Sequence, residues 1–376
     1  MAAAVFLARE GTKARVVEQA EKASEYSRAL AVNPRTLEIL EPSGVTARML
    51  ELGRPMRGAR FWHGGQTLFE LSFAELHHKY PFMLALSQAV TERLLAEAFA
   101  GLGGGVERGV ELVGCRNEFG HVVADLRRPS SPEQLEHCEC PWLLGADGSH
   151  SAVRESLGID FPGSVFERTW QLADLPLSTS LAEDMAHVFI LDGDGFVFYI
   201  PVIDDRPVPP GAAPIWRVLG NVPDLLSHLQ GASPAGPPIW ESSFRVAHRV
   251  ARRFQDGQVC LAGDAAHVHS PVGARGMNLG IEDAWVLARL VAGGTIDRYD
   301  ALRRGVDSRV VARVERLSRA ARGESPSSRF ARRFILPRAL RFVSLRRRML
   351  ELATGLDHEL DVGEVHEPAL TLGELP

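Results

Sequence analysis

Two aspartates stand beside a glycine at places where an apolar run has just ended, and this combination can bind a ligand. Gly263-Asp264 follows the run at 259–262, and Asp147-Gly148 follows the run at 142–146. Each carboxylate can accept hydrogen bonds from sugar-like hydroxyl groups, and glycine lets the backbone approach a flat ligand. Either motif alone is compatible with a tight turn. Because the motif occurs twice, we expect both aspartates to face one extended ligand.

A loop rich in proline and glycine follows the first motif and leads into a helical pattern. It runs from Pro271 through Gly273 to Gly276, and the helical pattern begins at about Gly276 and continues through Met277 and Asn278. The N-terminus of a helix stabilises negative charge through its dipole and its unpaired N–H groups. The sequence therefore predicts a strand, a loop and a helix N-terminus that present a carboxylate and backbone N–H groups to one ligand.

Glu18 follows Ala14-Arg15-Val16-Val17, which we predict to form a short buried strand. In dinucleotide-binding units, an acid at the end of the second strand accepts hydrogen bonds from ribose hydroxyls. The first strand and its Gly-x-Gly-x-x-Gly turn, expected about 20 residues before this acid, do not precede Glu18. Either translation starts upstream and the native protein has this turn, or Met1 is the true start and pyrophosphate binding is weakened. We favour the first explanation because the other motifs are intact.

These motifs require an α/β fold, in which parallel strands bring the ends of the apolar runs to one edge of a sheet. Residues 160–245 instead alternate aromatic strands with turns, which indicates an antiparallel sheet whose aromatic residues we assign to the core. We therefore predict an interleaved organisation with three parts: a discontinuous, Rossmann-like dinucleotide-binding domain lacking its N-terminal strand (1–58, 83–165 and 245–325), a mostly antiparallel substrate-binding sheet (59–82 and 166–244), and a C-terminal helical segment and tail (326–376).

Charge is unevenly distributed along the 376 residues. The net charge of −5 gives no reason to expect nucleic-acid binding, yet residues 303–348 hold fifteen arginines and three acids. Helices in this segment could cover the core while their guanidinium groups stay in water, which we favour. Alternatively, they form a patch for a membrane surface or an acidic partner. The two interpretations assign the apolar residues of this segment to different surroundings, the core or an external surface. These residues are Phe330, Phe334, Leu340, Phe342, Val343 and Leu345.

The sequence contains no apolar run long enough to span a membrane and no basic leader typical of a signal peptide. Its four cysteines show no disulfide framework, and the spacing of Cys138 and Cys140 is too short for a zinc pair. We therefore expect a cytoplasmic protein without a metal site.

Taken together, the motifs resemble those of the FAD-dependent aromatic hydroxylases, the class A flavoprotein monooxygenases of the para-hydroxybenzoate and phenol hydroxylase type. The resemblance covers about residues 1–350 and rests on Glu18, Arg28, Asp147-Gly148, Gly263-Asp264 and the loop from Pro271 to Asn278. It implies non-covalently bound FAD, NADPH or NADH as a transient reductant, O₂, and a small aromatic substrate that is phenolic or polyketide-like. The hydroxyl group would be transferred through a flavin hydroperoxide.

The resemblance also implies roles for individual residues. Asp264 would bind the ribityl chain, Glu18 the adenosine ribose, and Arg28 the pyrophosphate. Asp147 and Gly148 would serve both FAD and the nicotinamide cofactor, and Gln88 would lie beside FAD. The loop would lie along the isoalloxazine ring, and its flavin-facing and helix-starting residues are Pro271, Gly273, Gly276, Met277 and Asn278. Arg35 either faces phosphate oxygens or is exposed to solvent.

Other points stay open in the sequence. No residue is assigned as substrate base, because His267 and His269 are at least as compatible with structural roles. The alternatives to a hydroxylase are a flavin-linked reductase or dehydrogenase that does not use oxygen productively, and a non-catalytic remnant that has lost FAD. The length suggests a compact form without the thioredoxin-like C-terminal domain of larger family members. Substrate identity and oligomeric state are not determined.

Overall fold

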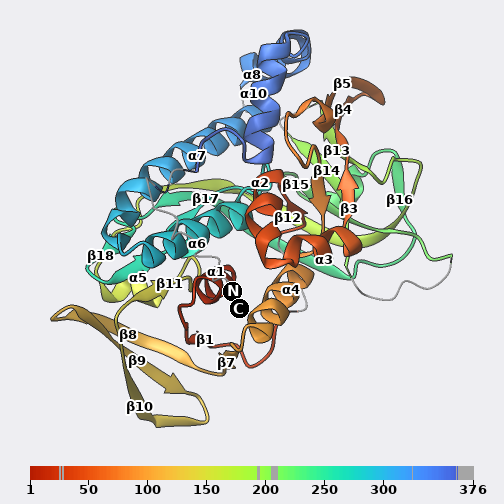
Figure 1. Ribbon diagram of the computed structural model, residues 1–376. Helices are drawn as coiled ribbons and strands as arrows, with labels where there is room; N and C mark the ends of the chain where they lie inside the picture. The colour runs from red at the N-terminus through yellow and green to blue at the C-terminus, as the bar shows by residue number, and fades with distance from the viewer. Residues whose placement is uncertain are drawn as a thin grey trace, which may run out of the picture.

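The structure is a computed structural model that describes residues 1–24, 27, 29–192, 195–204, 211–323, 325–360 and 362. Figure 1 shows a large sheet on one side of the molecule and a group of helices with small sheets on the other, with the long helix α7 running beside α6. The mixed α/β class predicted from the sequence is confirmed. Among the described residues, no helix combines the length and the apolar character needed to cross a bilayer.

The large sheet has nine strands in the order β20-β17-β12-β15-β14-β13-β4-β5, with β16 paired to β12. Every neighbouring pair is antiparallel except β13 and β4. A hairpin turns at Gly64-Gly65, where both glycines have positive φ between β4 and β5. The strands are β4 (Gly58–His63), β5 (Gln66–Ser72), β12 (Gly163–Thr179), β13 (Met185–Ile190), β14 (Phe196–Pro201), β15 (Ile215–Gly220), β16 (Ala232–Pro234), β17 (Trp240–Val250) and β20 (His267–Val268).

Four small sheets complete the strand content of the described residues. Two contain the parallel pairs β1-β7 and β11-β19, with β18 antiparallel to β19. The orders β2-β6-β3 and β10-β9-β8 are antiparallel. Their bounds are β1 (Val16–Glu18), β2 (Ala31–Val32), β3 (Arg54–Met56), β6 (Met83–Ala85), β7 (Val106–Arg108), β8 (Glu111–Glu118), β9 (His121–Arg128), β10 (Ser131–Cys140), β11 (Leu143–Gly145), β18 (Gln255–Asp256) and β19 (Val259–Leu261).

Helix α6 lies at the centre of the helical side, because its residues enter two apolar clusters. Ile281 and Ala284 pack with α1 and α4, whereas Val286 and Leu287 pack with β19. Side chains of Asn33 and Ser87 cap α2 and α4. The helices are α1 (Ala2–Arg9), α2 (Pro34–Leu40), α3 (Val45–Leu52), α4 (Gln88–Gly101), α5 (Ala152–Ser156), α6 (Gly276–Ala292), α7 (Tyr299–Arg322), α8 (Pro326–Phe330), α9 (Leu336–Ala339) and α10 (Val343–Thr354), with a π-helical turn η6 (Ala331–Ile335).

The C-terminal helices cover the core less than the sequence led us to favour. Leu340 is buried in the cluster that also holds Met56 and Ile200. The other five apolar residues of this segment named above are exposed. The covering interpretation is therefore correct for Leu340 and wrong for the rest, because only the inner side of the helical segment meets the sheet.

Candidate functional site

Asp264 lies on the surface directly after the buried strand β19. Gly263 has φ 59°, in the left-handed region, which turns the chain out of the strand. The two backbones approach closely here, since a Cβ added to Gly280 of α6 would lie 3.1 Å from the Gly263 Cα atom. The glycines therefore let α6 pack against the turn while the Asp264 carboxylate faces outward.

A buried charge network holds this turn from behind. The Gly263 N–H donates to Asp283 Oδ2 at 3.0 Å, and the same oxygen lies 2.8 Å from His267 Nε2. The guanidinium of Arg303 donates to Asp283 at 2.8 Å and to Asp307 at 2.7 Å. All four side chains of the network are essentially inaccessible to water. The network therefore fixes the backbone position from which Asp264 projects.

The titration of the network follows from its charges. Burial lowers the pKa of His267, but the carboxylates of Asp283 and Asp307 outweigh burial and bring this pKa to about 9. Burial raises the pKa of Asp283, yet Arg303 and His267 hold it below its ordinary value. Burial raises the pKa of Asp307 well above its ordinary value. The protonated His267 is thus paired with an ionised Asp283, which makes it a positioning residue rather than a substrate base.

His269, the other histidine near the loop, is held differently. Its Nδ1 lies 2.9 Å from the carbonyl oxygen of Ser270. Burial lowers its pKa to about 3, so the ring is neutral. Neither histidine is placed as an exposed base.

The predicted loop and helix N-terminus are both present. Helix α6 begins at Gly276, where the sequence predicted it. Gly273 and Ala274 have φ of 81° and 51°, so the loop turns twice through the left-handed region. A Cβ added to Gly276 would meet nothing within 4 Å, so the helix start is open on that side. The loop can therefore lie against a flat ligand.

The side chain of Asn278 makes its hydrogen bonds within the protein. Its Oδ1 accepts a hydrogen bond from the Asn33 N–H at 3.0 Å. Its Nδ2 donates to the carbonyl oxygens of Ala31 and Ala274. The amide therefore ties the loop to β2, and any contact of Asn278 with a cofactor would come from its backbone. Met277 is partly buried against the α1 and α4 cluster.

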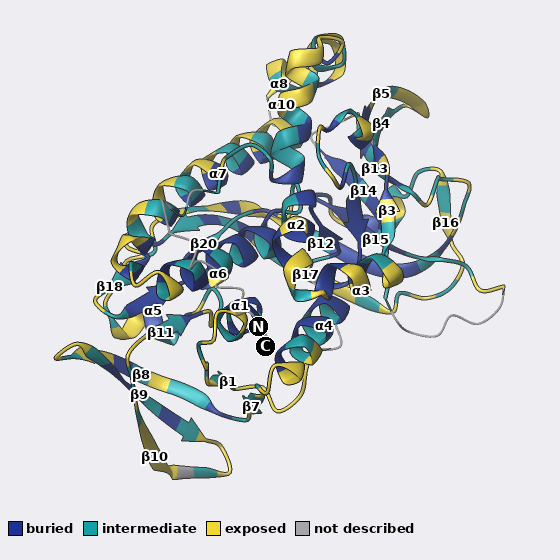
Figure 2. Ribbon diagram, in the orientation of Figure 1, coloured by how far each residue is buried: buried dark blue, intermediate teal, exposed yellow. Residues whose placement is uncertain are grey.

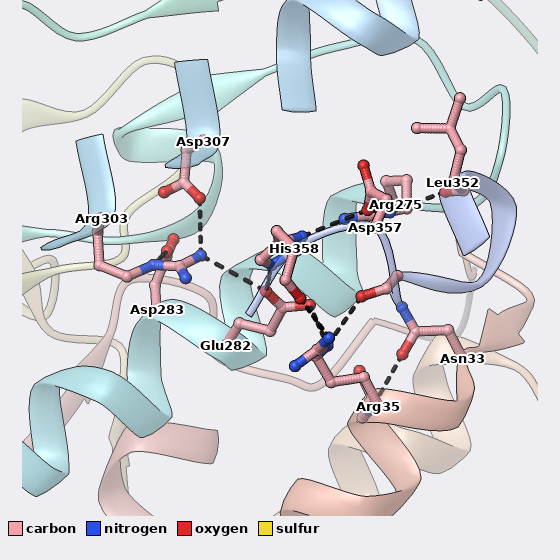
Figure 3. Close-up of polar contacts among 12 residues, drawn as sticks. Asn33, Arg35, Arg275, Glu282, Asp283, Arg303, Asp307, Leu352, Asp357 and His358 are labelled. Atoms are coloured by element: carbon pink, nitrogen blue, oxygen red, sulfur yellow. Dashed lines mark hydrogen bonds and ion pairs between the residues drawn. The ribbon is translucent and has the colours of Figure 1, made fainter. Parts of the chain in front are cut away.

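The C-terminal segment fastens the loop from the opposite side (Figure 3). The buried Arg275 donates to Asp357 at 2.7 Å and to the Leu352 carbonyl oxygen at 2.8 Å. His358 lies 2.6 Å from the Glu282 carboxylate. Burial raises the pKa of Asp357, but His358 and Arg275 hold it below its ordinary value. Sequence reasoning missed these residues, and an arginine inside a glycine-rich loop was the available signal.

Arg35 belongs to the same network and not to a phosphate site. Its guanidinium donates to the carbonyl oxygens of Gly355, at 2.8 Å, and of His358. Both earlier interpretations of Arg35, phosphate contact and solvent exposure, are therefore wrong. A segment distant in sequence supplies its acceptors.

The second aspartate motif lies on the neighbouring strand. Strand β11 pairs in parallel with β19, so Asp147 and Asp264 follow the carboxyl ends of adjacent strands. The Asp147 carboxylate accepts hydrogen bonds from Ser151 Oγ at 2.5 Å and from the Val153 N–H at 3.1 Å. Gly148 has φ 82°. Asp147 thus stabilises the start of α5, and Gly148 supplies an open backbone beside it.

The remaining predicted cofactor residues lie at the end of β1 and the start of α4. Glu18 is exposed, and its carboxylate accepts a hydrogen bond from the Ala20 N–H. Gln88 accepts one from the Ala29 N–H at 3.1 Å and donates to Glu92 at 2.7 Å. Arg28 lies outside the described residues. The structure thus places Glu18 on the surface and uses the Gln88 amide to hold residue 29.

One face of the large sheet meets the loop, and it was not assigned to the site from the sequence. Directly paired residues form an apolar row across six strands. Val272 and Ala274 of the loop belong to two apolar clusters that share Phe198 of this row. The signal was the alternation in β14, where Phe196 and Phe198 face the loop and Val197 faces away. The row contains Phe69, Phe61, Val188, Phe198, Leu219 and Leu172.

A buried ion pair interrupts this apolar face. Arg217 donates to both carboxylate oxygens of Asp174 at 2.7 Å, and each residue lies two positions along its strand from a member of the row. The guanidinium also lies 5.0 Å from the centre of the Trp240 ring. Because the two charges satisfy each other, the face stays predominantly apolar.

The described residues fit one half of an FAD molecule. An exposed carboxylate, turns in the left-handed region and an open helix N-terminus suit the ribityl chain and the isoalloxazine ring. The apolar sheet face beyond the loop suits an aromatic molecule next to that ring.

Comparisons with known proteins agree with this geometry. Residues 1–314 match the family described as FAD binding domain. The chain is 37% identical over 332 residues to 6-methylpretetramide 4-monooxygenase from Streptomyces rimosus, covering 81% of this chain and 57% of that protein. It is 31% identical to rifampicin monooxygenase from Streptomyces venezuelae, covering 95% and 76%. The chain therefore belongs to the FAD-binding-domain family, and the resemblance drawn from the motifs is confirmed.

Solved structures extend the comparison to the fold. Anhydrotetracycline hydroxylase from Streptomyces rimosus has a TM-score of 0.73 and 27% identity, covering 95% of this chain and 74% of that chain. The p-nitrophenol 4-monooxygenase from Pseudomonas putida has a TM-score of 0.81 over 95% of both chains, and its 21% identity supports the fold alone. The chain spans 57% of the length of the first curated relative named above.

Proposed function

We propose that this chain binds FAD and acts as a monooxygenase that consumes NADPH or NADH and O₂ to hydroxylate a small aromatic, polyketide-like molecule. The observation that carries the proposal is the position of the loop from Pro271 to Gly276. It lies between the exposed Asp264 and the apolar sheet face, and Val272 and Ala274 pack into that face. A cofactor along this loop and an aromatic substrate on the sheet face would be neighbours.

FAD, when bound, would supply electron transfer from the nicotinamide and the activation of O₂. The protein's part is to orient and to exclude water. Asp264 would accept hydrogen bonds from the ribityl hydroxyls, and the N–H groups at the start of α6 would stabilise negative charge on the ring. Phe198 and its row would shield the reacting region from water.

The relatives' names support the class of substrate. They act on 6-methylpretetramide and rifampicin, as their names state. Phe61 and Phe69 stack at the edge of the row, with ring centroids 4.2 Å apart. They give this chain an aromatic surface on which an aromatic substrate could pack. We infer a fused or substituted aromatic ring as substrate.

The proposal is tested with the purified full chain and FAD. A panel of phenols and polycyclic aromatic compounds is added, and NADPH and NADH oxidation is followed together with product mass. We expect at least one compound to accelerate oxidation and to gain the mass of one oxygen atom. Oxidation that yields only hydrogen peroxide with every compound would contradict hydroxylation and support the reductase alternative.

A further inference from the structure

The C-terminal helical segment combines positive charge with exposed apolar side chains. Residues 325–350 contain eight arginines and no aspartate or glutamate. Phe342 and Val343 are 67% and 64% exposed, and Phe330 is 56% exposed. We call these and the other large exposed apolar residues of the segment the C-terminal tip: Phe330, Phe334, Ile335, Phe342, Val343 and Leu345.

The tip is exposed because the segment is fastened by its other side. Leu340 and Leu350 are buried in the apolar cluster beneath the segment. The buried Arg332 donates to the Ala321 carbonyl oxygen at the end of α7, and Arg346 forms an ion pair with Glu75. Figure 2 shows α8 and α10 extending beyond the rest of the molecule with much of their surface exposed. The segment is therefore anchored, and its outer face carries the apolar side chains.

The charge of the segment restricts what can cover the tip. Arg332 is buried, and Arg346 and Arg347 pair with Glu75 and Glu351. A symmetric contact with the same tip of a second copy would still bring the remaining exposed arginines, such as Arg341 and Arg348, close to those of the other copy. An acidic protein surface would pair with the arginines but would leave six apolar side chains to be matched. An anionic bilayer offers phosphate groups to arginines and an apolar layer to phenylalanine, valine and leucine.

We infer that the C-terminal tip binds the surface of an anionic phospholipid membrane. The arginines contact lipid phosphates, and the apolar side chains enter the boundary between headgroups and acyl chains. This inference goes beyond the proposed function and does not depend on it. The interaction is peripheral, because the tip lies on short helices rather than on a membrane-spanning one.

A cleft at the base of the tip provides a place where a molecule from the membrane surface could enter. It has a volume of about 340 Å³, and its lining combines apolar residues with two glutamates and two arginines: Leu68, Phe69, Glu70, Glu75, Pro337, Leu340, Arg341 and Arg346. Phe69 belongs to the apolar row of the sheet face. An aromatic molecule with polar substituents at the bilayer surface would meet this cleft first. This consequence, unlike membrane binding itself, rests on the proposed function.

The test is sedimentation of the full chain with lipid vesicles. Vesicles of phosphatidylglycerol and phosphatidylcholine are compared with pure phosphatidylcholine at low and high salt. We expect binding only to the anionic vesicles, with weaker binding at high salt because the charges are screened. Changing the exposed Arg341 and Arg348 to Gln should weaken binding about fivefold per arginine. Changing Phe342 and Val343 to Ser should weaken it while the charge stays constant.

Matched controls come from exposed residues elsewhere. Phe119→Ser removes a fully exposed ring from the turn between β8 and β9, and Arg252→Gln removes an exposed arginine. Both should leave binding unchanged, and circular dichroism verifies that every variant is folded. Absence of binding to anionic vesicles, or equal binding by the tip variants, would overturn the inference. So would a dimer in sedimentation velocity that the Phe342 and Val343 changes dissociate.

Discussion

The two aspartate motifs look equivalent in sequence but differ in structure. The carboxylate of Asp147 accepts two hydrogen bonds from the start of α5, at Ser151 and Val153. Both aspartates are exposed, but the turn before Asp264 is held by Asp283, which accepts a hydrogen bond from the Gly263 N–H. Asp147 stabilises its own turn, whereas a buried network stabilises the turn that precedes Asp264. The two strand ends therefore differ in what holds their turns: the Asp147 side chain itself in one, and Asp283 of α6 in the other.

The largest loss of stability should come from breaking the buried network around Asp283. Asp283→Ala removes the acceptor of the Gly263 N–H, the carboxylate bonded to His267, and one of the two carboxylates that pair with the buried Arg303. Breaking a buried pair on one side costs about 3–5 kcal/mol. We expect a loss of this size in urea unfolding. Asp297→Ala, at an exposed acid, should change stability by less than about 0.5 kcal/mol. Equal effects would show that the network does not hold the turn.

The protonation of His267 should give the next largest effect. Its pKa is about 9 in the folded protein, against 6.5 ordinarily. The stability that protonation contributes is complete below pH 6.5 and is lost as the pH rises toward 9, by about 3 kcal/mol. Urea unfolding of the wild type should show this decline. His267→Gln should show a flatter profile between these pH values, and an identical decline in the variant would exclude His267 as its source.

Removing the other aspartate should have a smaller effect on stability. Asp147→Ala deletes the acceptor of the Val153 N–H and of the Ser151 hydroxyl, while Ser151 still caps the Arg154 N–H. The loss of a cap interaction costs about 1 kcal/mol. Thermal and urea unfolding measure this loss. If Asp147→Ala lowered the free energy of unfolding as much as Asp283→Ala, the two strand ends would not differ in how their turns are held.

Local features of the site could be predicted from the sequence. A glycine and an acid after an apolar strand predicted the turn at Asp264, and the glycine-rich loop predicted the start of α6 at Gly276. Aromatic stretches separated by turns over residues 160–245 predicted an antiparallel sheet, and the large sheet contains these strands. These features depend on short-range sterics and hydrogen bonding, which a few adjacent residues determine.

Long-range features could not be predicted. Arg275 and Asp357 are 82 residues apart in sequence, and nothing local to either indicates the other. Gln88 and Asn278 are side chains that the motif assigns to a cofactor, yet their amides bind backbone groups of residues 29–33. The tip was expected to be mostly buried because it is apolar. Its exposure depends on which side of the segment docks, and the composition of the segment does not determine that.

The most direct test of the account compares FAD binding by Asp264→Ala, Asp147→Ala and the wild-type full chain. Quenching of FAD fluorescence on titration measures each dissociation constant. We predict that the wild type binds FAD and that Asp264→Ala binds it about 10–100-fold more weakly, since hydrogen bonds to a charged group are lost. We predict that Asp147→Ala changes affinity less than about threefold, because the Asp147 carboxylate already accepts hydrogen bonds from Ser151 and Val153 and any contact of this motif with FAD would come from the Gly148 backbone. Equal affinity of the wild type and Asp264→Ala, or no binding by the wild type, would contradict the account.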